Sequence, residues 1–282
     1  MSQDAPFDRE LRRLRRDRAA RRFIEADYLH RLAADELIER LAFVKRDFRR
    51  ALDLGCAGGY LSCRLREQGM EVVSCDSGGA FAAGAGGVQG DEDRLPFADG
   101  AFDLVVCVGA LDTVNDLPGA LLLTRRTLRP DGLFLGAFAG AGSLPRLRRA
   151  MLAADSVEGG AAARIHPQID VRAAGDLLIR AGFALPVVDS QPVDVRFPSL
   201  LGLVRDLRAM AATNILGARS RRPLGRHALA AAIADFEEGG GKTAERFEIL
   251  HLLGWSPSPD QPRPARRGSG RVSLAEALKP PS

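Results

Sequence analysis

One stretch of the chain, residues 50–60, constrains the fold more than any other; it is RALDLGCAGGY. An apolar run that contains Asp53 leads into a turn rich in glycine, and a helical pattern follows the turn. Glycine has no Cβ and adopts positive φ values readily, so such a turn lets the backbone approach a ligand closely. The segment predicts the first strand of an α/β sheet, with a nucleotide-like ligand bound at the turn.

The order of the acid and the glycines distinguishes between nucleotide cofactors. Dinucleotide-binding turns follow G-x-G-x-x-G, but here Ala57 and Tyr60 occupy positions where that pattern has glycine. The order D-x-G-x-x-G-G fits S-adenosylmethionine (SAM) better than NAD. An ordinary strand, turn and helix without a ligand is the alternative. The residues of this segment that we expect at the cofactor are Asp53, Gly55, Cys56, Ala57 and Gly59.

Apolar runs and helical patterns alternate after residue 50, which predicts parallel strands with helices on both faces. Strands are expected at 51–55, 71–76, 88–90, 102–108 and 133–138, with helices at 59–68 and 118–128 and a turn at 130–132. Residues 81–87 are rich in glycine, so that crossover is expected to be short. Later helices are expected at 144–154, 172–181, 200–210 and 227–238, an extended segment broken by Pro192 at 186–197, and a last strand at 247–255.

Acids follow three successive predicted strands. Asp53 belongs to the first, Asp76 ends the second and is followed by Ser77, and Asp91 comes after the third with Glu92 beside it. The carboxyl ends of parallel strands lie at one edge of a sheet, where ligands bind. We expect Asp76 to accept from the ribose hydroxyls and Asp91 from the adenine amine. Singly, each acid is typical of a turn or a helix cap.

Four regions follow from these patterns. They are a basic helical region at 1–45, a SAM-binding core at 46–197, a helical cap inserted at 198–245, and a final strand with a tail rich in proline and arginine at 246–282. The cap is expected over the ligand crevice, because the segment is too long for a loop.

Composition narrows the class of protein. The chain is 46% hydrophobic and 27% charged, as in soluble globular proteins. No apolar run approaches the ~20 residues of a membrane helix, and the net charge of +4 with 6% aromatic residues does not favour nucleic-acid binding. The four cysteines form no C-x-x-C pair and are expected to be reduced and buried. We expect a bacterial cytoplasmic protein, with at most peripheral contact at the inner membrane.

Several motifs resemble known families. The segments LDLGC-x-x-GY, GD, LPF, FDLVV and LRPDG, at residues 52–60, 90–91, 95–97, 102–106 and 128–132, resemble class I SAM-dependent methyltransferases. The segments FDR, DYL, VNDLP, DLLIRAGF and GW, at residues 7–9, 27–29, 114–118, 176–183 and 254–255, are similar to the complex I assembly factor 5 family, as is the segment from residue 263 to residue 273.

The second resemblance covers nearly the whole chain and implies a function. Members of that family keep a methyltransferase fold, and the resemblance implies hydroxylation of an arginine on the quinone-site iron–sulfur subunit of respiratory complex I. The fold alone implies methyl transfer. Two positions depart from the family pattern, because Ala57 replaces its usual glycine and Asp112-Thr113 replace its usual His-Trp.

Catalytic candidates are few. Methyl transfer requires alignment and sometimes one general base, and Asp112 is the polar side chain that we expect near the transferred group; a helix-capping or solvated acid is the alternative. The histidines lack the spacing of an iron hydroxylase, so no metal site is predicted, and His166 is expected on the surface. No histidine or acid partner for Cys56 as a nucleophile is evident.

Two other functions remain open. The core pattern is also similar to enzymes that methylate a small carboxylic acid or an acyl-carrier thioester, which would act without a complex I subunit. The second is a non-catalytic assembly chaperone that kept the fold and lost the cofactor. Ala57, in place of the usual glycine of the cofactor turn, favours this function.

Overall fold

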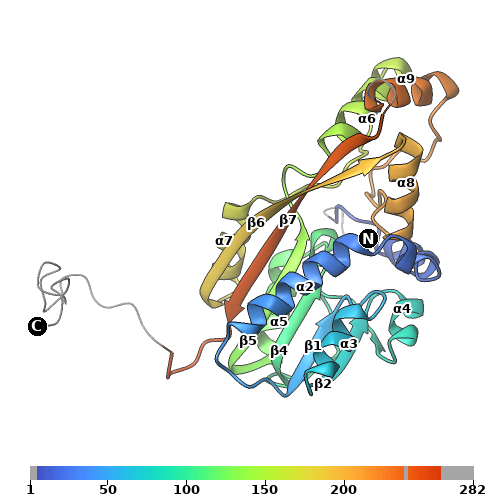
Figure 1. The fold of residues 1–282 in the computed structure, drawn as a ribbon. Helices are drawn as coiled ribbons and strands as arrows, with labels where there is room; N and C mark the ends of the chain where they lie inside the picture. The colour runs from blue at the N-terminus through green and yellow to red at the C-terminus, as the bar shows by residue number, and fades with distance from the viewer. Residues whose placement is uncertain (1–4, 238–240, 262–282) are drawn as a thin grey trace, which may run out of the picture.

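A seven-stranded sheet with the order β3-β2-β1-β4-β5-β7-β6 forms the framework of the molecule (Figure 1). This computed structural model describes residues 5–237 and 241–261, so most of the tail expected at 246–282 lies outside the described residues. The strands are β1 Arg50–Leu54, β2 Glu71–Asp76, β3 Val88–Gln89, β4 Phe102–Val108, β5 Leu128–Ala139, β6 Ala184–Phe197 and β7 Thr243–Trp255. The first five run parallel, and β7 pairs antiparallel with β5 and β6. The predicted fold class, a mostly parallel α/β sheet, is confirmed.

Helices cover both faces of this sheet. They are α1 Arg9–Ala19, α2 Tyr28–Ala42, α3 Tyr60–Glu67, α4 Gly79–Gly84, α5 Leu117–Thr127, α6 Pro145–Glu158, α7 Val171–Arg180, α8 Leu200–Ala209 and α9 Arg226–Phe236, with 3-10 turns η1 Phe23–Glu25 and η2 Leu111–Thr113. The expected short crossover at 81–87 overlaps the six-residue α4. None of the helices in the described ranges has the length and apolar character needed to cross a membrane.

The central strand β4 shows how the two layers arise. Successive side chains of a strand point to opposite faces. Leu104 and Val106 join the core that contains the apolar faces of α2 and α3, whereas Val105 and Cys107 join the core that contains those of α5 and α7. Strand β4 is buried along its whole length and is apolar on both faces except at Asp103, which accepts from the N–H groups of Arg49 and Arg50.

The antiparallel pair β6 and β7 extends beyond the parallel part of the sheet (Figure 1). Helices α6, α8 and α9 pack at its outer end, and α8 and α9 come from the segment between the two strands. Ala150 of α6 and Ala232 and Phe236 of α9 are fully buried there. The outer end therefore has an apolar core that continues the one beneath α2.

Two local expectations were wrong. Strand β6 continues through Pro192, because β6 is an edge strand paired only with β7 and such a position tolerates a residue that lacks an N–H. Residues 130–132 belong to β5 rather than to a separate turn. There the backbone of Asp131 and Gly132 bonds Ser256 just after β7, and β5 shifts register against β4.

Candidate functional site

The glycine turn after β1 has the geometry expected of a ligand-binding turn. Gly55 and Gly59 both have φ near +76°, and a Cβ on Gly55 would lie 2.4 Å from the Cβ of Ala110. Ala57 also has a positive φ of 44°, and its N–H donates to Asp76 at 3.0 Å. The turn therefore admits no side chain at Gly55, and Ala57 keeps the conformation that glycine usually adopts.

Asp53 lies beneath this turn and binds the following helix. Its side chain is nearly inaccessible, and Ser62 of α3 donates to Oδ2 at 2.5 Å. Burial raises the pKa of Asp53 to about 6, although the hydrogen bond from Ser62 opposes the shift and nearby Asp76 adds to it. The side chain fixes β1 to α3; its predicted contact with a cofactor stays a prediction.

Asp76 at the end of β2 is fully buried and accepts four hydrogen bonds. Oδ1 accepts from Arg16 Nε at 2.7 Å and from the Gly78 N–H at 2.7 Å. Oδ2 accepts from Arg16 Nη2 at 2.5 Å and from the Ala57 N–H at 3.0 Å. Burial alone would raise the pKa of Asp76, but the charge and hydrogen bonds of Arg16 lower it below its ordinary value. A carboxylate has about four lone-pair sites, so Asp76 has no acceptor capacity left.

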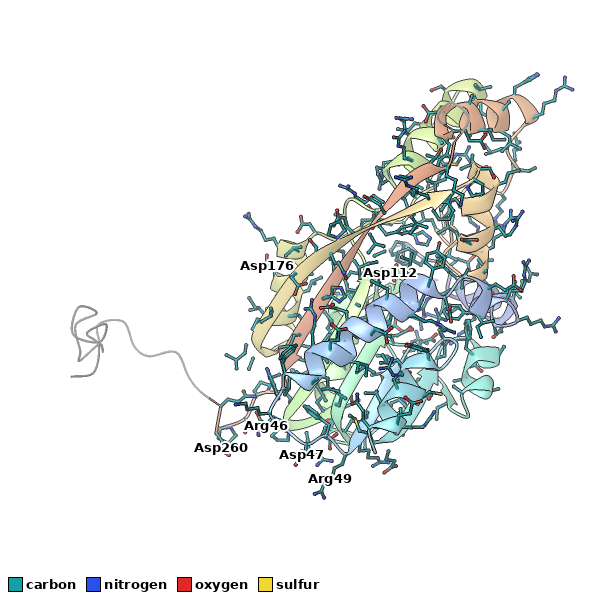
Figure 2. All side chains as sticks on the ribbon, viewed as in Figure 1. Arg46, Asp47, Arg49, Asp112, Asp176 and Asp260 are labelled. Carbon is teal, nitrogen blue, oxygen red and sulfur yellow. The ribbon has the colours of Figure 1, made fainter. Side chains whose placement is uncertain are left out.

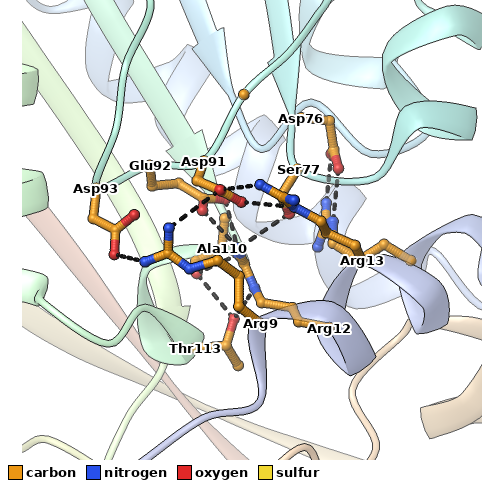
Figure 3. A network of polar contacts seen from close by, with 12 residues as sticks. Arg9, Arg12, Arg13, Asp76, Ser77, Asp91, Glu92, Asp93, Ala110 and Thr113 are labelled. Carbon is orange, nitrogen blue, oxygen red and sulfur yellow. Dashed lines mark hydrogen bonds and ion pairs between the residues drawn. The ribbon is translucent and has the colours of Figure 1, made fainter. Parts of the chain in front are cut away.

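The other predicted ligand-binding acids are paired in the same way (Figure 3). Glu92 accepts from both terminal nitrogens of Arg12, at 2.6 and 2.8 Å, and Arg12 also donates to Ser77 Oγ at 3.0 Å. Asp91 forms ion pairs with two further arginines, Arg9 and Arg13. The acids do gather at one edge of the sheet, but the side chains that they bind belong to α1.

The four arginines share one face of α1. Arg9, Arg12, Arg13 and Arg16 follow the i, i+3, i+4, i+7 spacing of neighbours on a helix surface. Sequence analysis identified both the basic helix and the acids but missed that they pair. The available indication was this spacing, which places four positive charges opposite a cluster of predicted acids.

A bound SAM molecule does not fit the acids as they are arranged with α1 docked. Ribose hydroxyls need acceptor oxygens, and those of Asp76 are all used. The space that remains beside Asp91 and Glu92 is about 10 Å³, roughly one water molecule. The glycine turn suits an adenosyl ligand, whereas the acids are engaged by arginine.

A large cavity of about 570 Å³ lies on the other side of the same arginines. Most of its lining is apolar, with side chains from α2, β5, α6, α8 and β7, including Leu29, Phe138, Leu147, Leu207 and Phe247. Arg12 and Arg16 also line it, so their side chains lie between the cavity and the acids. This volume accommodates a side chain or a small molecule.

Asp112 is the one carboxylate among the described residues that line this cavity. It belongs to η2, four residues beyond the end of β4, and Figure 2 labels it in the interior beside α2. Its Oδ1 is buried without a hydrogen-bond partner. Burial raises the pKa of Asp112, against the opposing charge of Arg12. A buried acceptor without a partner is costly, which suits a site that a cationic or hydroxyl group completes.

Three other expectations from the sequence need correction or comment. His166 is half-buried rather than fully on the surface: it lines the cavity, accepts from the Ile215 N–H at 3.0 Å, and its pKa is lowered to about 4 by burial and by Arg15. Cys56 is buried, and burial with nearby Asp53 raises the pKa of its thiol, which disfavours a nucleophile. Cys63, expected to be buried, is exposed.

Within the described ranges no group of three His, Cys, Asp or Glu side chains is placed to hold a metal ion.

Comparison with known sequences shows the family to which the chain belongs. Residues 52–136 match the family described as a methyltransferase domain. The mitochondrial arginine-hydroxylase NDUFAF5 of Danio rerio is 34% identical over 97% of this chain and 89% of its own length, and that of Homo sapiens is 35% identical over 97% and 83%. A malonyl-[acyl-carrier protein] O-methyltransferase of Nitrosospira multiformis is 30% identical over 88% of this chain and 90% of its own.

Solved structures share the fold at low sequence identity. A putative methyltransferase from Bacillus halodurans superposes with a TM-score of 0.56 at 16% identity, covering 80% of this chain and 99% of the other. A phosphoethanolamine N-methyltransferase of Haemonchus contortus, in complex with S-adenosylhomocysteine, has a TM-score of 0.51 at 13% identity and covers 80% and 52%. With the end-to-end sequence similarity, they place the chain in the class I SAM-dependent methyltransferase superfamily, as a member of the complex I assembly factor 5 family.

Proposed function

We propose that this protein is a methyltransferase-fold enzyme that modifies a protein substrate during assembly of respiratory complex I. The observation that carries the proposal is identity of 34–35% with NDUFAF5 proteins over 97% of the chain, which includes the N-terminal helices and the segment around α8 and α9 as well as the core. We take the quinone-site iron–sulfur subunit as partner and the bacterial cytoplasm as location. SAM is the proposed cofactor, with the turn from Gly55 to Gly59 and the acids Asp76, Asp91 and Glu92 as its site when α1 is not docked on them.

The cavity supports an arginine side chain as the group that is modified. An arginine has a long methylene stem and a guanidinium head, which match a mostly apolar cavity with one carboxylate. Among the described residues the lining also contains four arginines, but Arg12, Arg16 and Arg164 are paired with acids and Arg208 is exposed. The unpartnered oxygen of Asp112 would accept a charge-assisted hydrogen bond from that head. We therefore propose Asp112 as the residue that binds and orients the reacting side chain. Hydroxylation, the family-based form of the reaction, requires an external oxidant such as dioxygen together with a two-electron reductant. Methylation, the fold-based form, takes the methyl group of SAM and releases S-adenosylhomocysteine and a proton.

The test is mass spectrometry of the complex I subunit from cells that lack this protein. Loss of one oxygen from an arginine supports hydroxylation, and loss of one methylene supports methylation. Cells complemented with D112N are expected to show the unmodified subunit. D176N is the matched control, because Asp176 on α7 is exposed and does not line the cavity. An unchanged subunit in the deletion strain contradicts the proposal.

Methylation of an acyl-carrier substrate is the second candidate. Its support is the 30% identity with malonyl-[acyl-carrier protein] O-methyltransferases and the apolar lining of the cavity. Incubation of the purified protein with SAM and malonyl-loaded carrier protein tests it directly. A methyl ester formed without any complex I subunit favours this candidate. If neither substrate is modified but the complex I subunit still binds, a non-catalytic assembly chaperone is the remaining function.

A further inference from the structure

We propose that α1 is an internal competitor of the cofactor: while α1 is docked, its arginines occupy the acids that the adenosyl group needs, and cofactor binding requires α1 to leave. This inference rests on the proposed function, because it takes SAM as the cofactor. The competing groups are the guanidinium groups of Arg12 and Arg16. Each forms a bidentate pair with one carboxylate, Arg12 with Glu92 and Arg16 with Asp76.

The first argument is the complete use of Asp76. Its four hydrogen bonds include two from the backbone of its own turn, and the other two come from Arg16. Only the two contacts of Arg16 can be withdrawn without refolding the turn. Those are also the two acceptor positions that a pair of ribose hydroxyls would use. Arg16 and a ribose therefore exclude each other at Asp76.

The second argument is the position of the same arginines between two spaces. Arg12 and Arg16 bind the acids on one side and line the large cavity on the other. In the methyl-transfer form of the reaction, the methyl group of SAM must reach the substrate, so the two spaces have to be continuous during the reaction. Departure of α1 removes both guanidinium groups at once. It opens the cofactor site and joins it to the cavity.

The third argument is that α1 is held in a way that permits release. Two buried ion pairs hold α1 to the core, and buried ion pairs contribute little net stability because desolvation offsets their attraction. Among the described residues, the apolar contacts of α1 are limited to two small clusters, one that includes Ala19, Phe23, Phe81 and Ala57, and one in which Leu11 packs against Phe7, Ile215 and Leu216. Arg15 also donates to Thr213 and to the carbonyl of Asn214, so movement of α1 is coupled to the segment that follows α8.

One glycine allows a test that changes no charge. A Cβ on Gly78 would lie 2.7 Å from the Cβ of Arg16, and the φ of Gly78, −82°, allows alanine. The substitution G78A should push α1 away from the acids. Its matched control is G84A in α4, the short helix that Gly78 precedes as N-cap, where an added Cβ meets nothing within 4 Å.

A second pair of variants removes the competing groups themselves. R12Q/R16Q deletes both buried guanidinium groups. R18Q/R21Q is the control, because it removes the same charge from two exposed arginines of the same region. SAM affinity is measured by titration calorimetry on the full-length chain, and thermal unfolding checks that each variant is folded. We expect G78A and R12Q/R16Q to bind SAM about tenfold more tightly or better, because the competent state is more populated, and the two controls to match the wild type.

Trypsin provides an independent measurement on the wild-type protein. SAM should accelerate cleavage at the arginines of α1, because release exposes the helix. Affinity that is unchanged or weaker in R12Q/R16Q, or in G78A if the double variant does not fold, overturns the proposal, and so does protection of α1 by SAM. If the wild type and the variants all bind SAM with one affinity, the cofactor assignment stands and only the competition is wrong. If none binds SAM, both are wrong.

Discussion

Arg16 donates from Nε and Nη2 to the two oxygens of Asp76, at 2.7 and 2.5 Å, across 60 positions of sequence. Both side chains are buried, with 7% and 0% of their surfaces exposed. In class I methyltransferases the acid at this strand end is expected to hold the ribose, so this pair joins the N-terminal helix to the cofactor site. Whether Asp76 is available to a ribose therefore depends on whether α1 is docked.

This pair predicts a strong energetic coupling. D76N should destabilise the fold by up to about 3 kcal/mol, because it leaves Arg16 buried without its counter-charge for as long as α1 stays docked. Adding R16Q to D76N should recover much of that loss, since no unpaired charge remains. The measurement is the free energy of unfolding in urea for the two single variants and the double variant. The exposed pair Arg126 and Asp99 is the control, for which D99N should change stability by less than about 1 kcal/mol. Additive effects of D76N and R16Q would contradict the expected coupling.

The residues of the predicted crevice were accessible from sequence for a geometric reason. Asp76 and Asp91 follow parallel strands, and parallel strands end at one edge of a sheet, so their proximity follows from the alternation of elements. The partner of each acid was not accessible in the same way. A helical pattern shows which side chains share a face, but it does not show which surface that face will contact.

Two other features were not predicted from the sequence, because they too depend on how distant elements assemble. Pro192 lies in a continuous strand, because β6 is at the edge of the sheet, and edge position is a property of the assembled fold. His166 lines the cavity because α1 and the segment after α8 meet over it, which involves Phe7 and Ile215, 159 and 49 positions away. Local pattern predicted elements well, whereas contacts between distant elements required the structure.

The glycine turn should not tolerate alanine at Gly55. The added Cβ would lie 2.4 Å from the Cβ of Ala110, and the φ of +76° disfavours any L side chain. G55A should therefore lower the free energy of unfolding by about 3 kcal/mol, the sum of backbone strain and overlap. G175A is the control, because Gly175 lies inside α7 with nothing within 4 Å of an added Cβ, and it should stabilise the protein by about 0.5 kcal/mol. Equal denaturation midpoints for G55A and the wild type would show that the turn is not closely packed.

Asp53 predicts a pH dependence of stability. Its pKa is raised to about 6 by burial, so the folded state keeps a proton that the unfolded state loses near 3.8. The free energy of unfolding should therefore fall as pH rises from about 4 to about 6. D53N has no charge to bury. The free energy of unfolding of the wild type minus that of D53N should therefore decrease by up to roughly 3 kcal/mol as the pH rises across that window. This difference isolates Asp53 from Asp76, whose pKa shifts in the opposite direction. A difference that is constant between pH 4 and pH 7 would sink the prediction.

Asp112 should show opposite effects on stability and activity. The pKa of Asp112 is raised by burial, so its ionised form destabilises the folded protein at neutral pH, and the unpartnered oxygen adds to that effect. D112N removes the buried charge and should raise the melting temperature at pH 7 by about 2 °C or more. The advantage should shrink as the pH approaches 3.8, where the carboxyl becomes protonated in both states. The same variant should lose modification of the substrate, because it no longer offers a charge to a guanidinium group. A residue kept for structure alone would give the reverse result, a lower melting temperature with activity falling only in proportion to the folded fraction.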